Sequence, residues 1–202
     1  MEEIMIVRTG LANMASVEAA FTRLGQRVVW TKDPQLILRS DRVVLPGVGA
    51  FGPAMGKMRE LNLVEPLRER VAQGRPTLAI CLGLQMLAAA SEESPGAEGL
   101  ASFEGQLERF PDGLVVPHLG WNRLVATSTC RLLRSGHVYY ANSYRLREAP
   151  KGWTSATTDY GGSFVGALEC GDVLACQFHP ELSGAFGAAL LERWLIQGGA
   201  SC

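Results

Sequence analysis

The sequence lacks both a long hydrophobic run and a net charge of either sign. No apolar stretch in the 202 residues approaches the ~20 residues that a membrane span needs. The first residues, MEEIMIVRTG, are acidic at the start and contain no cationic region typical of a secretory signal. With 19 basic and 20 acidic residues, the charge favours neither nucleic acid nor an anionic membrane as a partner. We therefore expect a soluble cytoplasmic protein.

The sequence also lacks the cysteine spacing of a disulfide framework or a structural zinc site. Its five cysteines are odd in number and contain no CxxC pair. Cys170, Cys176 and His179 lie close together along the chain, but structural zinc needs about four converging ligands and no second pair completes the set. We therefore expect free thiols, no metal and no cofactor.

The first half of the chain alternates short apolar runs with amphipathic stretches, a pattern typical of a parallel sheet covered by helices. No repeat, low-complexity tract or linker divides the chain, so we predict one domain over residues 1–202. The predicted strands are Ile4–Val7, Arg27–Trp30, Arg42–Leu45 and Thr77–Ile80. The predicted helices are Ala15–Leu24, Leu63–Gln73 and the segment LGLQMLAAA after Cys81.

The second half has a different texture. From about Gly99 the segments alternate polar with apolar or aromatic residues, and Gly, Pro and Asn separate them, which predicts a strand-rich region. Near the end, Phe186, Leu190 and Trp194 are spaced four apart, so Ala185–Ile196 is predicted to be a helix that packs one apolar stripe on the sheet.

The segment AICLGLQ contains the sharpest local signal. An apolar strand ends at Cys81 and a helix begins at once, with Gly83 two residues later. A nucleophile on such a turn is exposed at the carboxyl end of a sheet, and the helix N-terminus favours its thiolate. A buried structural cysteine at a strand end is the alternative.

A catalytic thiolate needs a base, and the sequence offers His118, His137 and His179. In the segment QFHPELS, Glu181 follows His179 by two residues across Pro180. Residues i and i+2 of an extended segment project to the same side, so Glu181 can orient the imidazole. A solvated His–Glu turn is the alternative for this motif alone, and His118 and His137 stay unassigned.

Three segments together resemble the class I (triad) glutamine amidotransferases. They are Pro46–Gly47 after the third predicted strand, the elbow around Cys81, and the terminal HPE, in the order that this family has them. The first elbow position is Ala79, a small departure from the family's glycine. The resemblance implies a flavodoxin-like α/β fold, with a central mostly parallel sheet flanked by helices and an additional strand-rich region in the second half.

Further segments resemble the glutaminase subunits of imidazole glycerol phosphate synthases, enzymes of histidine biosynthesis. These segments are TGLANMASV, LPGVGAFG, PHLGWN and the SY of YYANSY, and together they span nearly the whole chain. The sequence departs from these subunits at Ala12, usually Gly; at Asn142, usually His; and at Leu182, usually a basic residue. These departures bear on the partner surface more than on the glutaminase chemistry.

The resemblance implies a set of site residues. Cys81, His179 and Glu181 would be the catalytic triad that hydrolyses glutamine through a thioester. Leu82 N–H would supply one oxyanion donor, and either Val48 or Gly49 N–H the other. Glutamine would be bound by Gly47, Gln85, Ser143 and Tyr144. The partner would be a (β/α)₈-barrel cyclase in a heterodimer that receives the ammonia, with Asn13, Trp121 and Tyr139 as interface candidates.

Other functions stay open on the residues alone. Gly47, Gly49 and Gly52 match the GxGxxG of dinucleotide sites, but that loop normally follows the first strand and here it follows the third. The amidotransferase subunit of another synthase, a cysteine hydrolase or peptidase of similar fold, and a docking subunit with a relic site are the remaining alternatives.

Overall fold

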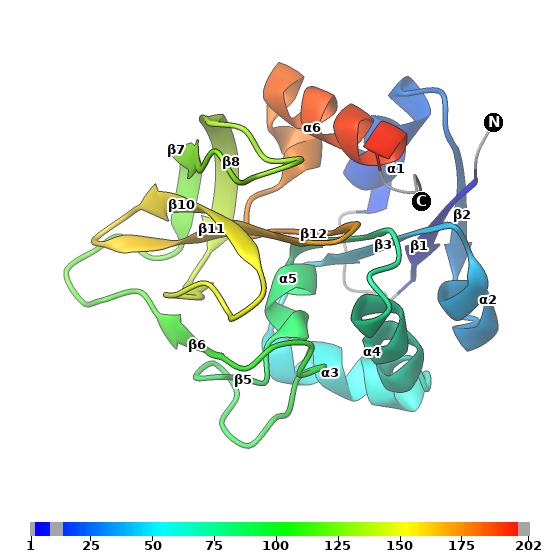
Figure 1. The fold of residues 1–202 in the computed structure, drawn as a ribbon. Helices are drawn as coiled ribbons and strands as arrows, with labels where there is room; N and C mark the ends of the chain where they lie inside the picture. The colour runs from blue at the N-terminus through cyan, green and yellow to red at the C-terminus, as the bar shows by residue number, and fades with distance from the viewer. Residues whose placement is uncertain (1–2, 9–13, 198–202) are drawn as a thin grey trace.

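The computed structural model describes residues 3–8 and 14–197. Within them, a nine-stranded sheet crosses the molecule in the order β2-β1-β3-β4-β12-β11-β10-β7-β8 (Figure 1). Its first five strands pair in parallel. They are β1 (Glu3–Val7), β2 (Arg27–Thr31), β3 (Arg42–Gly47), β4 (Thr77–Cys81) and β12 (Val173–Cys176).

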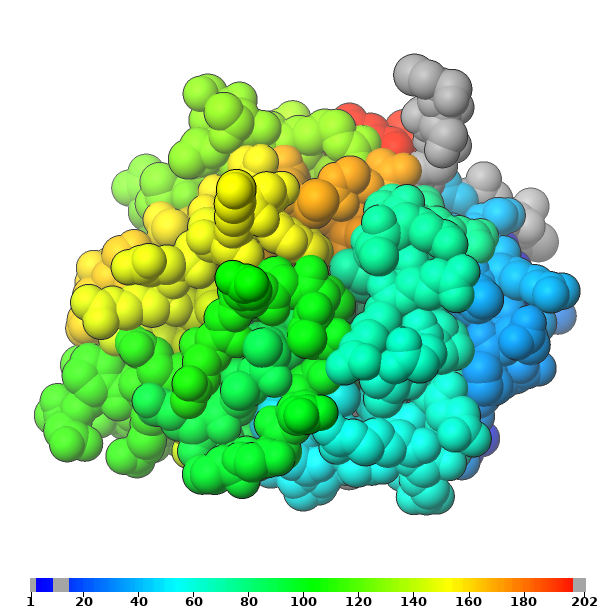
Figure 2. Space-filling view, turned by 60° about the horizontal axis from the view of Figure 1, so that its bottom comes forward, coloured from blue at the N-terminus to red at the C-terminus, as the bar shows by residue number. Residues whose placement is uncertain are grey.

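Helices cover both faces of this parallel part. One face carries α1 (Met14–Arg23) and α6 (Gly184–Gln197), and the other carries α2 (Pro34–Arg39), α3 (Phe51–Glu60), α4 (Val64–Ala72) and α5 (Leu82–Leu87) (Figure 1). Figure 2 shows α3 and α4 beside the segment that follows α5. Strand residues alternate between two apolar cores: Ile4 and Ile6 face α1 and α6, whereas Met5 and Val7 face the other helices. The predicted α/β arrangement is confirmed.

The strand-rich second half is also confirmed. Four antiparallel strands extend the sheet: β11 (Ser163–Cys170), β10 (Thr154–Asp159), β7 (His118–Ala126) and β8 (Gly136–Asn142). A smaller sheet combines β5 (Ala90–Ser91), β6 (Gln106–Arg109) and β9 (Tyr144–Arg145). A short 3₁₀ turn, η1 (Pro180–Leu182), leads into α6.

The prediction for the helix after Cys81 was too long, because α5 ends at Leu87 instead of continuing to Ala90. The backbone of Ala88 is extended, and Ala89 N–H donates to Gly105 O at 3.1 Å. Backbone pairing with the segment 99–105 therefore outweighs the high helix propensity of three alanines. Helices α2 and α3 have no counterpart among the predicted elements. None of the described helices is long and apolar enough to cross a bilayer.

The parallel pairing brings three chain segments to one edge of the sheet. β3 and β4 pair so that Gly47 lies opposite Cys81, and β12 pairs with the other side of β4, with Cys176 opposite Ile80. The residues that follow these strands therefore meet at the carboxyl edge, where open α/β sheets bind their ligands.

Candidate active site

Cys81 lies on a strained elbow between β4 and α5. Its φ of 54° and ψ of −108° are unusual for a residue with a side chain. The turn is tight because glycines let the backbone approach: a Cβ on Gly83 would lie 2.0 Å from Leu45 O, and one on Gly47 would lie 2.8 Å from Leu82 Cβ. Strain of this kind persists where packing determines it, often at functional sites. The elbow therefore holds the thiol at the start of α5.

His179 and Glu181 form a buried pair at the end of the segment that leaves β12. Nδ1 of His179 lies 2.8 Å from Glu181 Oε1, and the two side chains are 7% and 3% exposed. The His179 backbone is fixed on both sides, since its N–H donates to Tyr139 O at 2.9 Å and its carbonyl accepts from Ser183 Oγ at 2.7 Å. Glu181 therefore orients the imidazole, as the spacing of the two residues predicts.

The surroundings of His179 favour its protonated form. Burial by itself lowers the pKa of His179, but hydrogen bonds with Cys81 and Glu181, and the negative charges of both, outweigh burial and raise the pKa to about 10. An imidazolium at neutral pH stabilises an adjacent thiolate and can protonate a leaving amine. The Cys81 thiolate and the His179 imidazolium can thus act as an ion pair.

A cavity of about 260 Å³ opens in front of Cys81 and His179. Six of the predicted oxyanion and glutamine residues line it: Val48, Gly49, Leu82, Gln85, Ser143 and Tyr144. The wall at Tyr144 is held by two amides, since Gln85 Nε2 and Asn142 Nδ2 donate to Tyr144 O at 3.1 and 3.0 Å. Asn142, one of the departures from the resembled subunits, therefore takes part in the pocket wall.

Glu93 also lines this cavity, and sequence reasoning missed it. Its carboxylate accepts from Phe51 N–H at 2.7 Å, at the start of α3. Glu93 lies in an irregular segment after β5, where no periodic pattern distinguishes one glutamate from its neighbours. The fold brings Glu93 into the pocket, and no local pattern in the sequence indicates this.

The other predicted residues that the structure describes, apart from the triad, lie outside the cavity lining. Gly47 lies beneath the elbow, against Leu82. Trp121 on β7 faces Tyr139 on β8 with ring centroids 6.0 Å apart, close to the pocket wall at Ala141. Asn13 and the departure at Ala12 lie outside the described residues.

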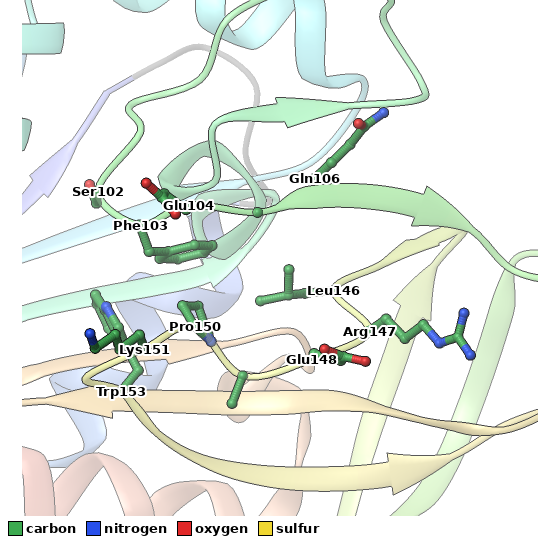
Figure 3. A pocket seen from close by; sticks show the side chains of 12 residues that line it. Ser102, Phe103, Glu104, Gln106, Leu146, Arg147, Glu148, Pro150, Lys151 and Trp153 are labelled. Carbon is green, nitrogen blue, oxygen red and sulfur yellow. The ribbon is translucent and has the colours of Figure 1, made fainter.

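A larger hollow of about 720 Å³ lies away from the triad, between Ser102–Gln106 and Leu146–Trp153 (Figure 3). Its lining includes the edge-to-face pair of Phe103 and Trp153, but neither a cysteine nor a histidine. In the part of the chain that the structure describes, no group of three His, Cys, Asp or Glu side chains is placed to hold a metal. The candidate site is the smaller cavity, which is lined by Cys81 and His179.

A thiol on a strand-to-helix elbow, paired with an imidazole and its carboxylate at the carboxyl edge of an α/β sheet, is the arrangement typical of thiol-dependent hydrolases of the triad type. The family model for class-I glutamine amidotransferases matches residues 12–197. A solved glutamine amidotransferase superposes with a TM-score of 0.77 at 22% identity, covering 97% of this chain and 99% of that one, so it shares the fold.

Relatives with higher sequence identity identify the subfamily. Subunit HisH of imidazole glycerol phosphate synthase from Methanothermobacter thermautotrophicus is 40% identical over 195 residues, which cover 95% of this chain and 97% of that subunit. The chloroplastic synthase hisHF of Arabidopsis thaliana is 39% identical over 95% of this chain, which spans 34% of that protein. The chain therefore belongs to the class I glutamine amidotransferases and, among them, to the HisH subunits of imidazole glycerol phosphate synthase.

Proposed function

We propose that this HisH subunit hydrolyses glutamine to glutamate and ammonia at Cys81, His179 and Glu181, and delivers the ammonia to a cyclase subunit that forms imidazole glycerol phosphate in histidine biosynthesis. The observation that carries the proposal is a small cavity lined by Cys81, on a strained elbow, and by His179, which is paired behind it with the buried Glu181. These groups supply a nucleophile, a proton carrier and its orienting carboxylate.

In the first half of the reaction, Cys81 Sγ attacks the side-chain amide carbon of glutamine. His179, oriented through its Nδ1 by Glu181, gives a proton to the departing nitrogen, and ammonia leaves as the C–N bond breaks. A γ-glutamyl thioester on Cys81 remains. His179 then takes a proton from water, which attacks the thioester carbon and releases glutamate and the thiolate.

The negative oxygen that forms on the amide carbon needs preorganised donors, each worth roughly 3 kcal/mol. Leu82 N–H is the first backbone donor after the nucleophile, at the N-terminus of α5, and Leu82 lines the cavity. The second donor is assigned to the loop of Val48 and Gly49 on the opposite wall. Gly49 has a φ of +100°, a conformation that a glycine adopts without strain.

The rest of the pocket suits the amino-acid end of glutamine. Glu93 places a carboxylate in the lining, where it can pair with the α-ammonium group. Gln85 lines the pocket, and because its nitrogen donates to Tyr144 O and to Gln177 Oε1, its amide oxygen is left to accept from the substrate. Ser143 and Tyr144 form the facing wall. These contacts support glutamine as substrate over a longer peptide.

An exposed apolar face beside the pocket supports docking of the partner. It consists of Leu119 and Trp121 on β7 and the half-buried Tyr139 on β8, and we refer to it as the apolar face. Leu119 and Trp121 are 66% and 58% exposed, unusual values for residues of this size. Strand pairing sets Leu119 opposite Ala141, which lines the pocket, so the face begins at the pocket wall.

The partner is assigned as a (β/α)₈-barrel cyclase in a heterodimer. The name of the plant relative joins the designations H and F, and this protein matches about a third of that chain. This coverage fits a chain that contains two parts of one synthase. Ammonia released into water at neutral pH becomes mostly ammonium, which is not nucleophilic. A route sealed by a docked partner keeps it reactive.

A Cys81→Ala variant in complex with the cyclase tests the proposal. The complex should lose glutamine-dependent synthesis and keep synthesis from added ammonium salts, because only the glutaminase step needs the thiol. Glutamate release and product formation, measured for the variant and wild type with each nitrogen source, separate the two steps. Loss of both activities would contradict delivery of ammonia from a separate site.

A further inference from the structure

Gln177 is a buried polar residue that the mechanism above does not use. It lies two residues before His179 and is 0% exposed. Its Nε2 lies 3.8 Å from Cys81 Sγ, and its Oε1 accepts from Gln85 Nε2 at 3.1 Å. The amide therefore touches the nucleophile on one side and a pocket residue on the other, without lining the pocket itself.

The neighbouring donors and acceptors fix which end of the amide faces the sulfur. Tyr144 O can only accept, so the Gln85 atom at 3.1 Å from it must be the nitrogen. That same nitrogen faces Gln177, which must present its acceptor, Oε1, in return. The donor end of Gln177, Nε2, is therefore directed at Cys81 Sγ.

We propose that Gln177 is a second hydrogen-bond donor to the Cys81 sulfur, opposite the substrate side, which stabilises the thiolate and holds it for attack. The proposal rests on the proposed glutaminase function of Cys81. An N–H group directed at an ionised acceptor forms a stronger bond than one to a neutral acceptor, and burial strengthens it further. Gln177 is also held in place, since its backbone N–H donates to Gly166 O at 2.9 Å.

The same contacts couple the pocket to the nucleophile. Gln85 lines the pocket and orients the Gln177 amide, and the amide in turn contacts Sγ. A substrate that positions Gln85 thereby also positions the donor of Cys81. Gln85 then has two tasks, as part of the pocket wall and as the residue that orients Gln177.

Two substitutions separate this role from a structural one. Gln177→Met removes both the donor and the acceptor and keeps the length of the side chain. Gln177→Glu keeps the shape and the acceptor for Gln85, but sets a carboxylate against the sulfur. The measurement is the rate at which iodoacetamide alkylates Cys81 in the 202-residue chain, followed by mass spectrometry of the Cys81 peptide over a pH series.

The rate at neutral pH should fall about tenfold in Gln177→Met, the effect of one hydrogen bond to a charged group, and further in Gln177→Glu. The kcat for glutamate release in the complex should fall in the same order, with little change in KM. If Gln177 serves only to orient Gln85, Gln177→Met will alkylate at the wild-type rate, because alkylation does not require the pocket, and that result overturns the proposal.

Thr158→Val is the matched control. Thr158 is also buried and makes one side-chain hydrogen bond, to the Tyr140 hydroxyl at 2.6 Å, away from the sulfur. Its alkylation rate should equal that of wild type, and an equal slowing would mean that general loosening explains the effect. Alkylation requires no glutamine. A wild-type complex that releases no glutamate would therefore refute the proposed function while the order of alkylation rates still tests Gln177.

Discussion

At the scale of single residues, the pairing of Glu181 with His179 depends on the negative charge of Glu181. Both side chains are buried, so the carboxylate acts on the imidazole with little screening by water. Its neutral isostere would keep the shape of the contact and lose the stabilisation of the imidazolium that forms as the thiol ionises.

Glu181→Gln should therefore lower kcat about 100-fold or more with a smaller change in KM, because Glu181 does not line the pocket. Glutamate release by the complex measures both constants. Glu60→Gln, at an exposed position of α3, serves as the control and should match wild type. An unchanged kcat in Glu181→Gln would remove Glu181 from the triad.

His118 illustrates the opposite electrostatic case. Its ring is stacked between Tyr140 and Tyr160, at centroid distances of 4.8 and 4.0 Å, and its Nδ1 has no hydrogen-bond partner. Burial lowers the pKa of His118 below its ordinary value of 6.5. The folded protein therefore holds this histidine neutral where the unfolded chain would protonate it.

The sign of the resulting pH dependence follows from linkage. Below about pH 6.5 the unfolded state binds a proton that the folded state excludes, so this contribution to stability is complete above that pH and declines as the pH falls. His118→Phe should reduce the loss of unfolding free energy between neutral and acidic pH, measured by urea denaturation. Val115→Ala, an exposed change that removes no titratable group, should leave that dependence unchanged. A His118→Phe slope equal to wild type would contradict the assignment.

At the scale of elements, the approach of α5 to β3 decides where the nucleophile sits. Gly83 is the contact point, because its missing side chain leaves room for the carbonyl of Leu45. Gly56, in α3, has nothing within 4 Å of the place where a Cβ would be. Both glycines lie in helices, but only Gly83 is packed against another element, so the two positions can be compared as a test and its control.

Gly83→Ala should destabilise the protein by at least 2 kcal/mol or so, since the backbone carbonyl at 2.0 Å must move. Gly56→Ala should stabilise it by about 0.5–1 kcal/mol through the higher helix propensity of alanine. Urea unfolding curves of the two variants measure both effects. Equal effects would show that close packing does not determine the elbow.

At the scale of the whole molecule, the antiparallel extension places an exposed face next to the triad. β7 and β8 are the last two strands of the same sheet (Figure 1), and β8 ends at Ala141 and Asn142, which line the pocket beside the triad. The apolar face is therefore rigidly connected to the pocket through Ala141. Under the proposed function, a partner bound there would cover the region from which ammonia leaves.

Trp121→Gln should weaken binding of the cyclase by about 2 kcal/mol or more, the range for a central aromatic contact, and leave the unfolding free energy nearly unchanged. Leu36→Gln, a half-exposed residue on α2 at the other end of the sheet, is the control. Titration calorimetry with the cyclase measures the affinity. Equal affinities for Trp121→Gln and wild type would move the docking surface elsewhere.

The sequence by itself determined the features that depend on local patterns. Apolar periodicity predicted the parallel strands, and the resemblance to the amidotransferase family predicted that Cys81, His179 and Glu181 form one triad. A strand that ends at a cysteine before a helix, and a histidine two residues from a glutamate, are patterns of neighbouring residues, so they can be recognised in the sequence.

Tertiary structure alone decided the rest, because those features depend on contacts between segments far apart in the chain. Backbone pairing with residues 99–105 ended α5 early, and the fold carried Glu93 into the pocket from an irregular segment. It buried the Arg70 side chain completely against backbone carbonyls, although arginine is usually exposed. The donor from Gln177 to Cys81 likewise joins residues 96 positions apart, which no local pattern reveals.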